Sequence, residues 1–291
     1  MTNNTPASSH VPGAAKVGTD FWTETLRVFF VSPWKHRSLI AQMVKREVVG
    51  RYRGSVMGLL WSFLNPLLML IVYTFVFSVV FKAKWSTGGD ETKADFALIL
   101  FVGMIVHGIF AECVNRAPRL ILDNVNFVKK VVFPLEILPW VALGATLFHA
   151  LVSIAVWAIF FLLIKGYLPW TVVFLPLVAL PLVVLTMGLA WFLAATGVYL
   201  RDVAQTTGIL TTVLMFLSPI FYPASALPEG YRSLLHLNPL TFLIEQARAV
   251  LVWGQLPNFA GLALYSLAAV AFALLGLAWF QKTRRGFADV L

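Results

Sequence analysis

The chain has 291 residues, of which 59% are hydrophobic and only 12% are charged. Soluble domains carry about 25% charged residues, so this composition excludes an ordinary water-soluble fold. The net charge of +9 and the pI near 9.8 alone would suit a nucleic-acid-binding protein. The basic residues instead follow a membrane-topology pattern, which argues against that class. The single cysteine, Cys113, excludes an intrachain disulfide framework.

The N-terminal region divides into two parts. Residues 1–18 are rich in Thr, Ser, Asn, Ala and Pro, which predicts a disordered tail. No basic start, apolar run and small-residue cleavage site follow one another there, which argues against a signal peptide. Residues 19–50 place aromatic and aliphatic side chains opposite basic ones. This pattern predicts cytoplasmic helices that lie in the membrane interface rather than across it.

The first membrane span is predicted directly after a basic segment. No charged residue occurs between Gly54 and Phe81, a run longer than the ~20 residues that a spanning helix needs. Four basic residues precede the run closely: Lys45, Arg46, Arg51 and Arg53. Because basic flanks stay on the cytoplasmic side, this helix is expected to start inside and end outside.

Small residues and a proline mark the start of this span. Gly50, Gly54 and Gly58 are spaced by four, so a continuous helix would place them on one face. Such a face allows either ordinary close packing or a specific contact with another subunit. Asn65-Pro66 follows, and the proline predicts a kink.

Five more apolar segments predict five more spans within a transmembrane domain of residues 51–291. They are residues 96–111 with polar ends through 115, then 137–164, 171–200, 203–222 and 259–280. Six spans place both termini on one side. Sixteen of the 22 Lys and Arg residues then lie in inner segments, so the positive-inside rule puts both termini in the cytoplasm.

Residues 223–258, between the last two spans, contain four prolines but also a helical apolar spacing. The apolar positions are Leu240, Leu243, Ile244, Ala247 and Leu251, and the polar face holds Thr241, Glu245 and Arg248. The segment is too short and too polar to cross a membrane. It predicts two short re-entrant helices on the outer side, which are stable only when buried in protein or lining a water-filled cavity.

Several short motifs in the first span carry a family resemblance. They are Arg51-Tyr52-Arg53, Gly58-Leu59-Leu60-Trp61, Asn65-Pro66 and Tyr73-Thr74-Phe75-Val76-Phe77. They resemble the first membrane helix of polysaccharide-exporting ABC transporter permeases, the type 2 exporters of O-antigen, capsule and teichoic acid. The sequences of these motifs are most similar to those of the O-antigen, or Wzm-type, branch. The resemblance extends from about Leu39 to the C-terminus.

This resemblance implies an all-α integral membrane protein of six spans, with an N-terminal interface helix and periplasmic re-entrant helices. It also implies a homodimeric channel in the bacterial inner membrane, driven by two copies of a separate ABC ATPase. The cargo would be a lipid-linked glycan of the kind used in lipopolysaccharide biosynthesis. Two alternatives stay open: an integral-membrane transferase acting on lipid-linked sugars, and a drug- or lipid-exporting permease of the same superfamily.

The inner loop of residues 115–134 is the candidate coupling element. Its segment Asn126, Phe127, Val128, Lys129 and Lys130 resembles the family's coupling helix, which docks in a cleft of the ATPase. An apolar pair beside two lysines also suits a docking contact with a charged rim. The alternative is a solvated basic loop held by anionic lipid.

No catalytic or metal-binding motif is found in the chain. A Gly-Lys dipeptide is absent, so there is no P-loop, and His-Glu-x-x-His and paired metal-ligand cysteines are absent as well. We therefore expect no cofactor here, with ATP and Mg bound by the partner ATPase. His107, Glu112 and His149 are polar residues within spans, which either face a cavity or are satisfied by packing. Glu112 has Arg116 one turn further on as a possible partner.

Aromatic residues, 14% of the chain, are the candidates for a substrate path. Sugar rings stack on aromatic faces, so an aromatic-lined conduit would suit a glycan. The candidates are Trp61, Tyr73, Phe77, Phe216 and Tyr222. The alternative is that these rings anchor at the membrane interface or pack against lipid.

Overall fold

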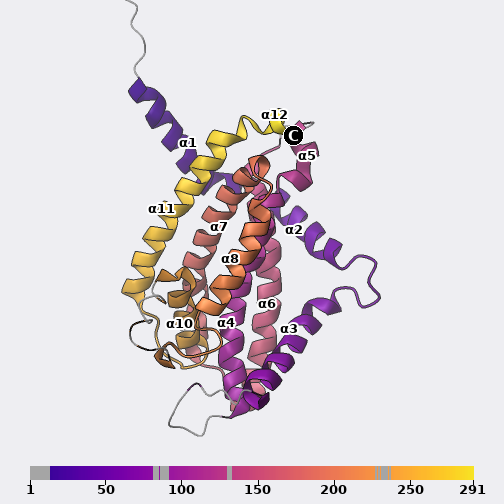
Figure 1. Cartoon of the computed structure of the whole chain (residues 1–291), viewed down its shortest axis with the longest axis vertical. Coiled ribbons are helices and arrows are strands. Elements are labelled where there is room, and N and C mark those ends of the chain that lie inside the picture. The colour runs from indigo at the N-terminus through magenta and orange to yellow at the C-terminus, as the bar shows by residue number, and fades with distance from the viewer. Residues whose placement is uncertain are drawn as a thin grey trace, which may run out of the picture.

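The computed structural model describes residues 14–80, 85, 92–129, 133–226, 228, 230, 235 and 237–291, with side chains from residue 21 onward except at Ser78. Every regular element within these ranges is helical (Figure 1). The expected all-α fold is therefore confirmed. Helices α1, α5 and α12 gather at one end of the bundle, called here the α5 end.

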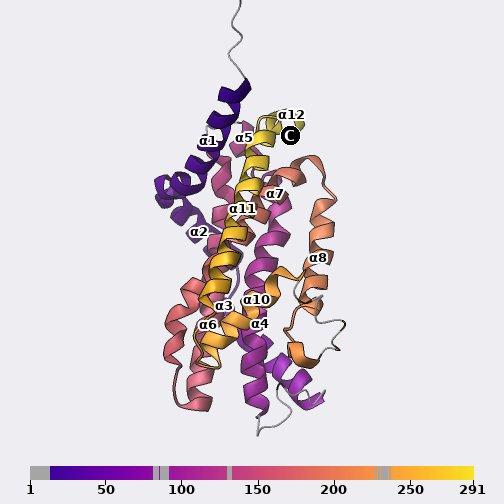
Figure 2. The same ribbon diagram turned by 90° about the vertical axis from the view of Figure 1, so that its left-hand side faces the viewer.

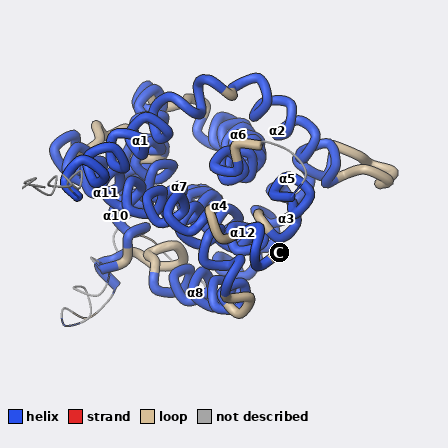
Figure 3. The backbone as a smooth tube through the Cα atoms, turned by 90° about the horizontal axis from the view of Figure 1, so that it is seen from above, coloured by secondary structure: helices blue, strands red, loops and turns tan. Residues whose placement is uncertain are grey.

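The chain begins with two helices outside the bundle, α1 (Ala14–Lys35) and α2 (Arg37–Arg51). They form an arc along one side when seen from above (Figure 3), with α1 packed on α11 and α2 on α6. Thr25 Oγ1 donates to Gln281 Oε1 at 2.5 Å and ties the two ends of the chain together. Residues 14–18, expected in a disordered tail, are helical; the rest of that predicted tail lies outside the described residues.

The expected continuous first span is broken at its start. Turns occupy residues 52–59, and helix α3 (Leu60–Tyr73) begins only after them. Gly54 and Gly58 have φ of 86° and 51°, the left-handed region that glycine adopts without a Cβ penalty. The expectation that they share a helix face with Gly50 is therefore wrong, because neither lies in a helix.

Helix α3 continues through Pro66 instead of ending there, and its irregular part comes later. The last turns, Thr74–Val80, are π-helical. Thr74 Oγ1 donates to the Leu70 carbonyl at 2.5 Å. Insertions of this kind inside a helix locally widen it and are frequent at functional sites.

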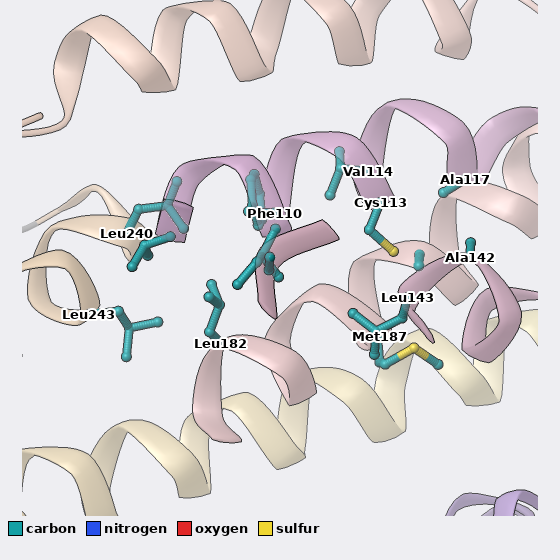
Figure 4. Close-up of a cluster of buried hydrophobic side chains, with 14 of the residues drawn as sticks. Phe110, Cys113, Val114, Ala117, Ala142, Leu143, Leu182, Met187, Leu240 and Leu243 are labelled. Carbon is teal, nitrogen blue, oxygen red and sulfur yellow. The ribbon is translucent and has the colours of Figure 1, made fainter. Parts of the chain in front are cut away.

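Helix α4 forms the centre of the bundle. In the candidate span Lys93–Arg119, 72% of the most apolar window is buried, against 11% in Leu60–Phe77. Helix α4 is therefore the core, whereas α3 lies at the periphery. Figure 4 shows side chains of α4, α6, α7 and α10 packed together, among them Phe110, Cys113, Val114, Leu143, Leu182, Met187 and Leu240.

The remaining long helices pack around this centre. They are α6 (Leu138–Lys165), α7 (Leu175–Tyr199) and α11 (Phe259–Arg284), while the central helix α4 comprises Lys93–Arg116. Helices α7 and α11 meet at Gly188 and Gly276, where a Cβ on Gly276 would lie 2.1 Å from the Gly188 carbonyl oxygen. Small residues let two backbones approach this closely in a membrane protein.

Within the described residues, five helices are long and apolar enough to cross a membrane, and α8 (Val203–Leu217) is apolar but has only 15 residues. At ~1.5 Å per residue it is shorter than a ~30 Å hydrocarbon core. Figure 2 shows α8 along one flank, with α6 on the opposite flank. The predicted segment 203–222 is cut short because Ser218 is extended and Pro219 follows. The expected fifth span, residues 203–222, is thus present as a helix of less than spanning length.

Short elements connect the long helices. They are the 3-10 turns Ala117–Arg119, Leu122–Asn124, Leu135–Ile137, Trp170–Phe174 and Ala224–Ala226, and helices α5 (Val125–Lys129) and α12 (Phe287–Val290).

Helix α10 (Pro239–Leu251) forms where the second of the two re-entrant helices was expected. In the stretch expected to form the first, residues 227, 229, 231–234 and 236 lie outside the described residues. Asn238 caps α10 by accepting from the Leu240 amide at 2.9 Å. The predicted apolar positions are all buried. Thr241 and Arg248 of the predicted polar face are buried as well.

Candidate functional site

Two ion pairs connect α2 to α4. Arg51 Nη1 lies 2.5 Å from Glu112 Oε1, and Arg116 pairs with Glu47. The expected local pair of Glu112 and Arg116 is therefore wrong. The reason is tertiary: α2 brings carboxylate and guanidinium groups of its own to α4, and longer-range pairs replace the one-turn pair.

A cavity of about 260 Å³ lies between α3, α4 and α6, next to this ionic contact. Its polar lining consists of Arg51, Tyr52, Ser62, Asn65, Tyr73, Glu112, Thr146, His149 and Ser153. Tyr52 Oη lies 3.5 Å from His149 Nδ1. Burial raises the pKa of Tyr52 above its ordinary value and outweighs the opposing effect of Arg51, so the phenol stays neutral. The structure thus brings Glu112 and His149 together, as the sequence could not show.

His107, the other polar residue predicted within a span, lies elsewhere. It is buried, and its Nε2 is 3.0 Å from the Thr211 carbonyl oxygen on α8. Thr211 Oγ1 in turn donates to Asn115 Oδ1 at 3.0 Å. His107 therefore links α4 to α8, which is the packing role that was one of its two expected readings.

The predicted aromatic path is partly assembled. Tyr73 and Phe77 from the end of the first span meet Phe221, with ring centroids 6.4 Å and 4.8 Å away. Phe216 on α8 lies 5.9 Å from the same ring. Phe221 was not among the predicted path residues, and only its aromatic character pointed to it. The four rings Tyr73, Phe77, Phe216 and Phe221 are called here the aromatic cluster.

The two remaining path candidates differ in position. Tyr222 Oη donates to the Phe216 carbonyl at 3.0 Å, so it adjoins the aromatic cluster. Trp61 stands twelve residues before Tyr73 on α3, about 18 Å along a helix. Trp61 is therefore not part of the cluster.

The predicted coupling segment forms a helix of its own, α5, at the α5 end. Asn126 and Lys129 are exposed, while Phe127 and Val128 are half-buried. Phe127 stacks on Phe133, with centroids 4.4 Å apart and ring planes 10° from parallel. The expected exposed apolar pair is thus partly used inside the chain. Lys130 lies outside the described residues.

Sequence reasoning missed the central role of Arg248 on α10. The side chain is completely buried and donates to the carbonyls of Ile99, Pro219 and Ile220, with its nitrogens 2.5–3.1 Å from the oxygens. Its guanidinium also lies 4.1 Å from the centre of the Trp85 ring. A lone arginine in an apolar-spaced helix was the available signal, but it was assigned only to the polar face of that helix. Arg248 joins α10, α4 and the segment after α8.

In the part of the chain that the structure describes, no group of three His, Cys, Asp or Glu residues could hold a metal ion. Cys113 is buried in the core. The polar groups that do converge are suited to hydrogen bonding and ion pairing between helices.

Comparison with known proteins places this geometry in context. Residues 38–252 match the family described as ABC-2 type transporter. The chain is 32% identical over 260 residues to the O-antigen export system permease protein RfbA of Myxococcus xanthus, covering 88% of this chain and 96% of that protein. It is 25% identical over 239 residues to the polysialic acid transport protein KpsM of Escherichia coli, covering 81% and 90%. The capsule polysaccharide export inner-membrane protein CtrC of Neisseria meningitidis serogroup B is 22% identical over 272 residues, covering 92% and 96%.

Proposed function

This chain belongs to the ABC-2 type transporter family, and we propose that it is the channel-forming membrane subunit of an exporter for lipid-linked, O-antigen-like polysaccharide. The family resemblance read from the first span is thereby confirmed. The observation that carries the proposal is the match to the Myxococcus xanthus O-antigen permease along nearly the whole of both chains. The apolar helices support a location in the bacterial inner membrane.

A separate ATPase supplies the energy in this proposal. The chain has no P-loop, so it cannot bind nucleotide by that route. A transport subunit without its own nucleotide site needs a rigid, accessible element through which force is received. Helix α5, with Asn126 and Lys129 exposed at the α5 end, is the element we assign to this contact. ATP and Mg are bound by the partner.

The channel is formed by two copies of the chain. Helices α3 and α8 both lie at the periphery of the bundle and carry large exposed apolar side chains, such as Ile71 and Ile209. The aromatic cluster lies between these two helices. Pairing two protomers along this side would enclose the rings of both copies and provide a path with stacking surfaces for sugar rings.

Deletion of the gene in its own bacterium tests the proposal. We expect surface polysaccharide to disappear and the lipid-linked glycan to accumulate inside the cell, because synthesis continues while export stops. An impermeant lectin measures the first, and extraction of the lipid-linked glycan measures the second. Re-expression of the chain restores both. Normal surface polysaccharide after deletion would contradict the proposal, and loss of drug or lipid export instead would favour the other permease class.

A further inference from the structure

The cavity between α3, α4 and α6 lies within membrane-spanning helices. Its wall follows α3 from Ser62 to Tyr73 and α6 from Thr146 to Ser153. Both stretches fall inside candidate spans. Polar groups at membrane depth are costly unless they meet a partner or a polar ligand, so a polar-lined cavity here requires an explanation.

Three polar groups of this wall have no partner within the described residues. Thr146 Oγ1 and His149 Nε2 are buried and accept or donate no hydrogen bond. The Asn65 side chain is exposed on α3 and forms no hydrogen bond to another described residue. Asn65 alone offers two donors and an acceptor. Leaving a buried group such as Thr146 Oγ1 or His149 Nε2 unpaired costs about 1–3 kcal/mol, which a ligand with matching groups would recover.

The charges of the cavity favour an uncharged ligand. Among the described residues that line it, Arg51 is the only cation besides His149 and is already paired with Glu112 at 2.5 Å, and no further acidic or basic side chain of that part of the chain faces it. A phosphate or diphosphate would enter without a free cation to balance it. A neutral molecule rich in hydroxyl groups meets the unpaired amide, hydroxyl and imidazole without that cost.

The size and the apolar surfaces narrow the ligand further. A volume of about 260 Å³ is below the ~300 Å³ at which pockets for drug-sized molecules begin, so the cavity takes one ring rather than a chain of rings. Tyr52, Tyr73 and Phe101 provide aromatic faces in the same wall. A pyranose combines an apolar C–H face with a rim of hydroxyl groups and fits both kinds of surface.

We propose that this cavity is a binding subsite for a single neutral sugar ring, held by Asn65, Thr146 and His149. The inference rests on the proposed function, because a glycan exporter is the setting in which such a ring reaches membrane depth. It assigns the subsite to a place within one protomer, between α3, α4 and α6, where Tyr73 is shared with the aromatic cluster.

Thiol protection tests the proposal on the full chain in lipid nanodiscs. Cys113→Ala removes the native thiol, and Ser153→Cys places a new one in the cavity wall. The rate of reaction with N-ethylmaleimide is measured with and without methyl glycosides of common neutral hexoses and 6-deoxyhexoses. We expect a saturating glycoside to slow the reaction at least threefold, while the acyclic polyol sorbitol has no effect. Tyr167→Cys is the control, because this position lies in the exposed turn after α6. Neither the glycoside nor sorbitol should change the reaction rate of its thiol.

Matched variants connect the protection to the named groups. Thr146→Val and Asn65→Leu keep the approximate side-chain shape and remove the polar atoms. Each should raise the half-protecting glycoside concentration about tenfold, the effect of one or two lost hydrogen bonds. Thr186→Val is the control, because Thr186 Oγ1 is also buried and unpaired but does not line this cavity. It should leave the concentration unchanged.

Comparing glucosides with a long and a short alkyl group distinguishes two sources of the sugar ring, the lipid-linked end of the glycan and a unit further along the polymer. Protection by octyl glucoside, below its micelle-forming concentration, at a lower concentration than methyl glucoside indicates the headgroup of a lipid-linked glycan. Equal protection indicates a sugar unit further along the polymer. Either result supports the subsite.

Three outcomes would overturn the inference. They are a reactive Ser153→Cys that no glycoside protects, which means a hydrated cavity only; no reaction at that position; and protection by inorganic phosphate in place of sugars. These outcomes are separate from failure of the proposed function. If deletion of the gene abolishes glycan export and yet no glycoside protects, the subsite alone is wrong; if deletion leaves export normal, the exporter proposal is wrong.

Discussion

At the scale of single residues, the side chain of Arg248 joins three segments of the chain through its hydrogen bonds, a role that no residue predicted as functional from the sequence has. A guanidinium has five donors in a fixed fork, and three backbone carbonyls from two other segments occupy that fork. Glu245 Oε1, 3.3 Å away, balances the charge. Gly103 makes room, since a Cβ there would lie 2.9 Å from Arg248 Nη2.

Arg248→Met is therefore expected to destabilise the folded chain. The change removes the hydrogen bonds that Arg248 donates to three carbonyls and leaves Glu245 without its cation. Breaking a buried pair costs about 3–5 kcal/mol, and a smaller loss is expected here because the Glu245 side chain is 33% exposed. Arg248→Lys should rescue little, because a single ammonium cannot reproduce the fork. Arg201→Met, in the exposed turn between α7 and α8, is the control. Thermal unfolding monitored by size-exclusion chromatography gives the readout, and equal melting of both methionine variants would argue against this role.

At the scale of elements, α5, which we propose as the docking helix, is held by its own chain. The stacked pair of Phe127 and Phe133 fixes its orientation, and Lys129 is left exposed for a partner. The aromatic ring thus supports the helix, while charge at its surface is available for recognition.

Lys129→Glu should reduce co-purification of the ATPase about tenfold or more. A substitution that reverses a charge at the rim of an interface disrupts the charge complementarity between the two proteins, which slows association and weakens binding. The same substitution at Lys282, exposed near the end of α11, tests whether any lost positive charge would suffice. An identical loss in both variants, or none at Lys129, would place the coupling contact elsewhere, with α2 as the next candidate.

The aromatic cluster offers a second test at this scale. If it lines the glycan path, Tyr73→Ala and Phe77→Ala should slow export several-fold while assembly with the ATPase is retained. Stacking of a nucleobase on an aromatic side chain contributes roughly 1–3 kcal/mol per base to nucleic-acid binding. We expect a comparable loss of binding free energy when an aromatic ring that stacks on a sugar is removed. Phe75→Ala is the matched control, because Phe75 belongs to the same π-helical turn but is 59% exposed. Export slowed equally by all three variants would remove the path assignment.

At the scale of the whole molecule, the short α8 and the buried α10 define an asymmetric bundle. Helix α4 is enclosed, whereas α3 and α8 are open to lipid or to a second copy. The distribution of basic residues predicts the orientation of this bundle, with the α5 end on the cytoplasmic side.

Cysteine labelling in intact cells tests the orientation. In a Cys113→Ala background, Tyr167→Cys should react with an impermeant maleimide before lysis, because the turn after α6 is predicted to lie outside. Lys129→Cys should react only after lysis, because α5 is predicted to lie in the cytoplasm. The opposite pattern would invert the topology, and labelling of both residues before lysis would contradict a single orientation.

The sequence by itself determined the class of protein, its family and the places of most helices. These follow from composition, from apolar runs and from periodicity within one helix, as in residues 240–251, where every predicted apolar position is buried. Only the tertiary structure decided which polar groups meet. Arg51 and Glu112 stand 61 residues apart and Arg248 and Ile99 stand 149 apart, so no local pattern links them. The break at residues 52–59 and the early end of α8 were likewise hidden, because an apolar run does not reveal where packing or a left-handed glycine ends a helix.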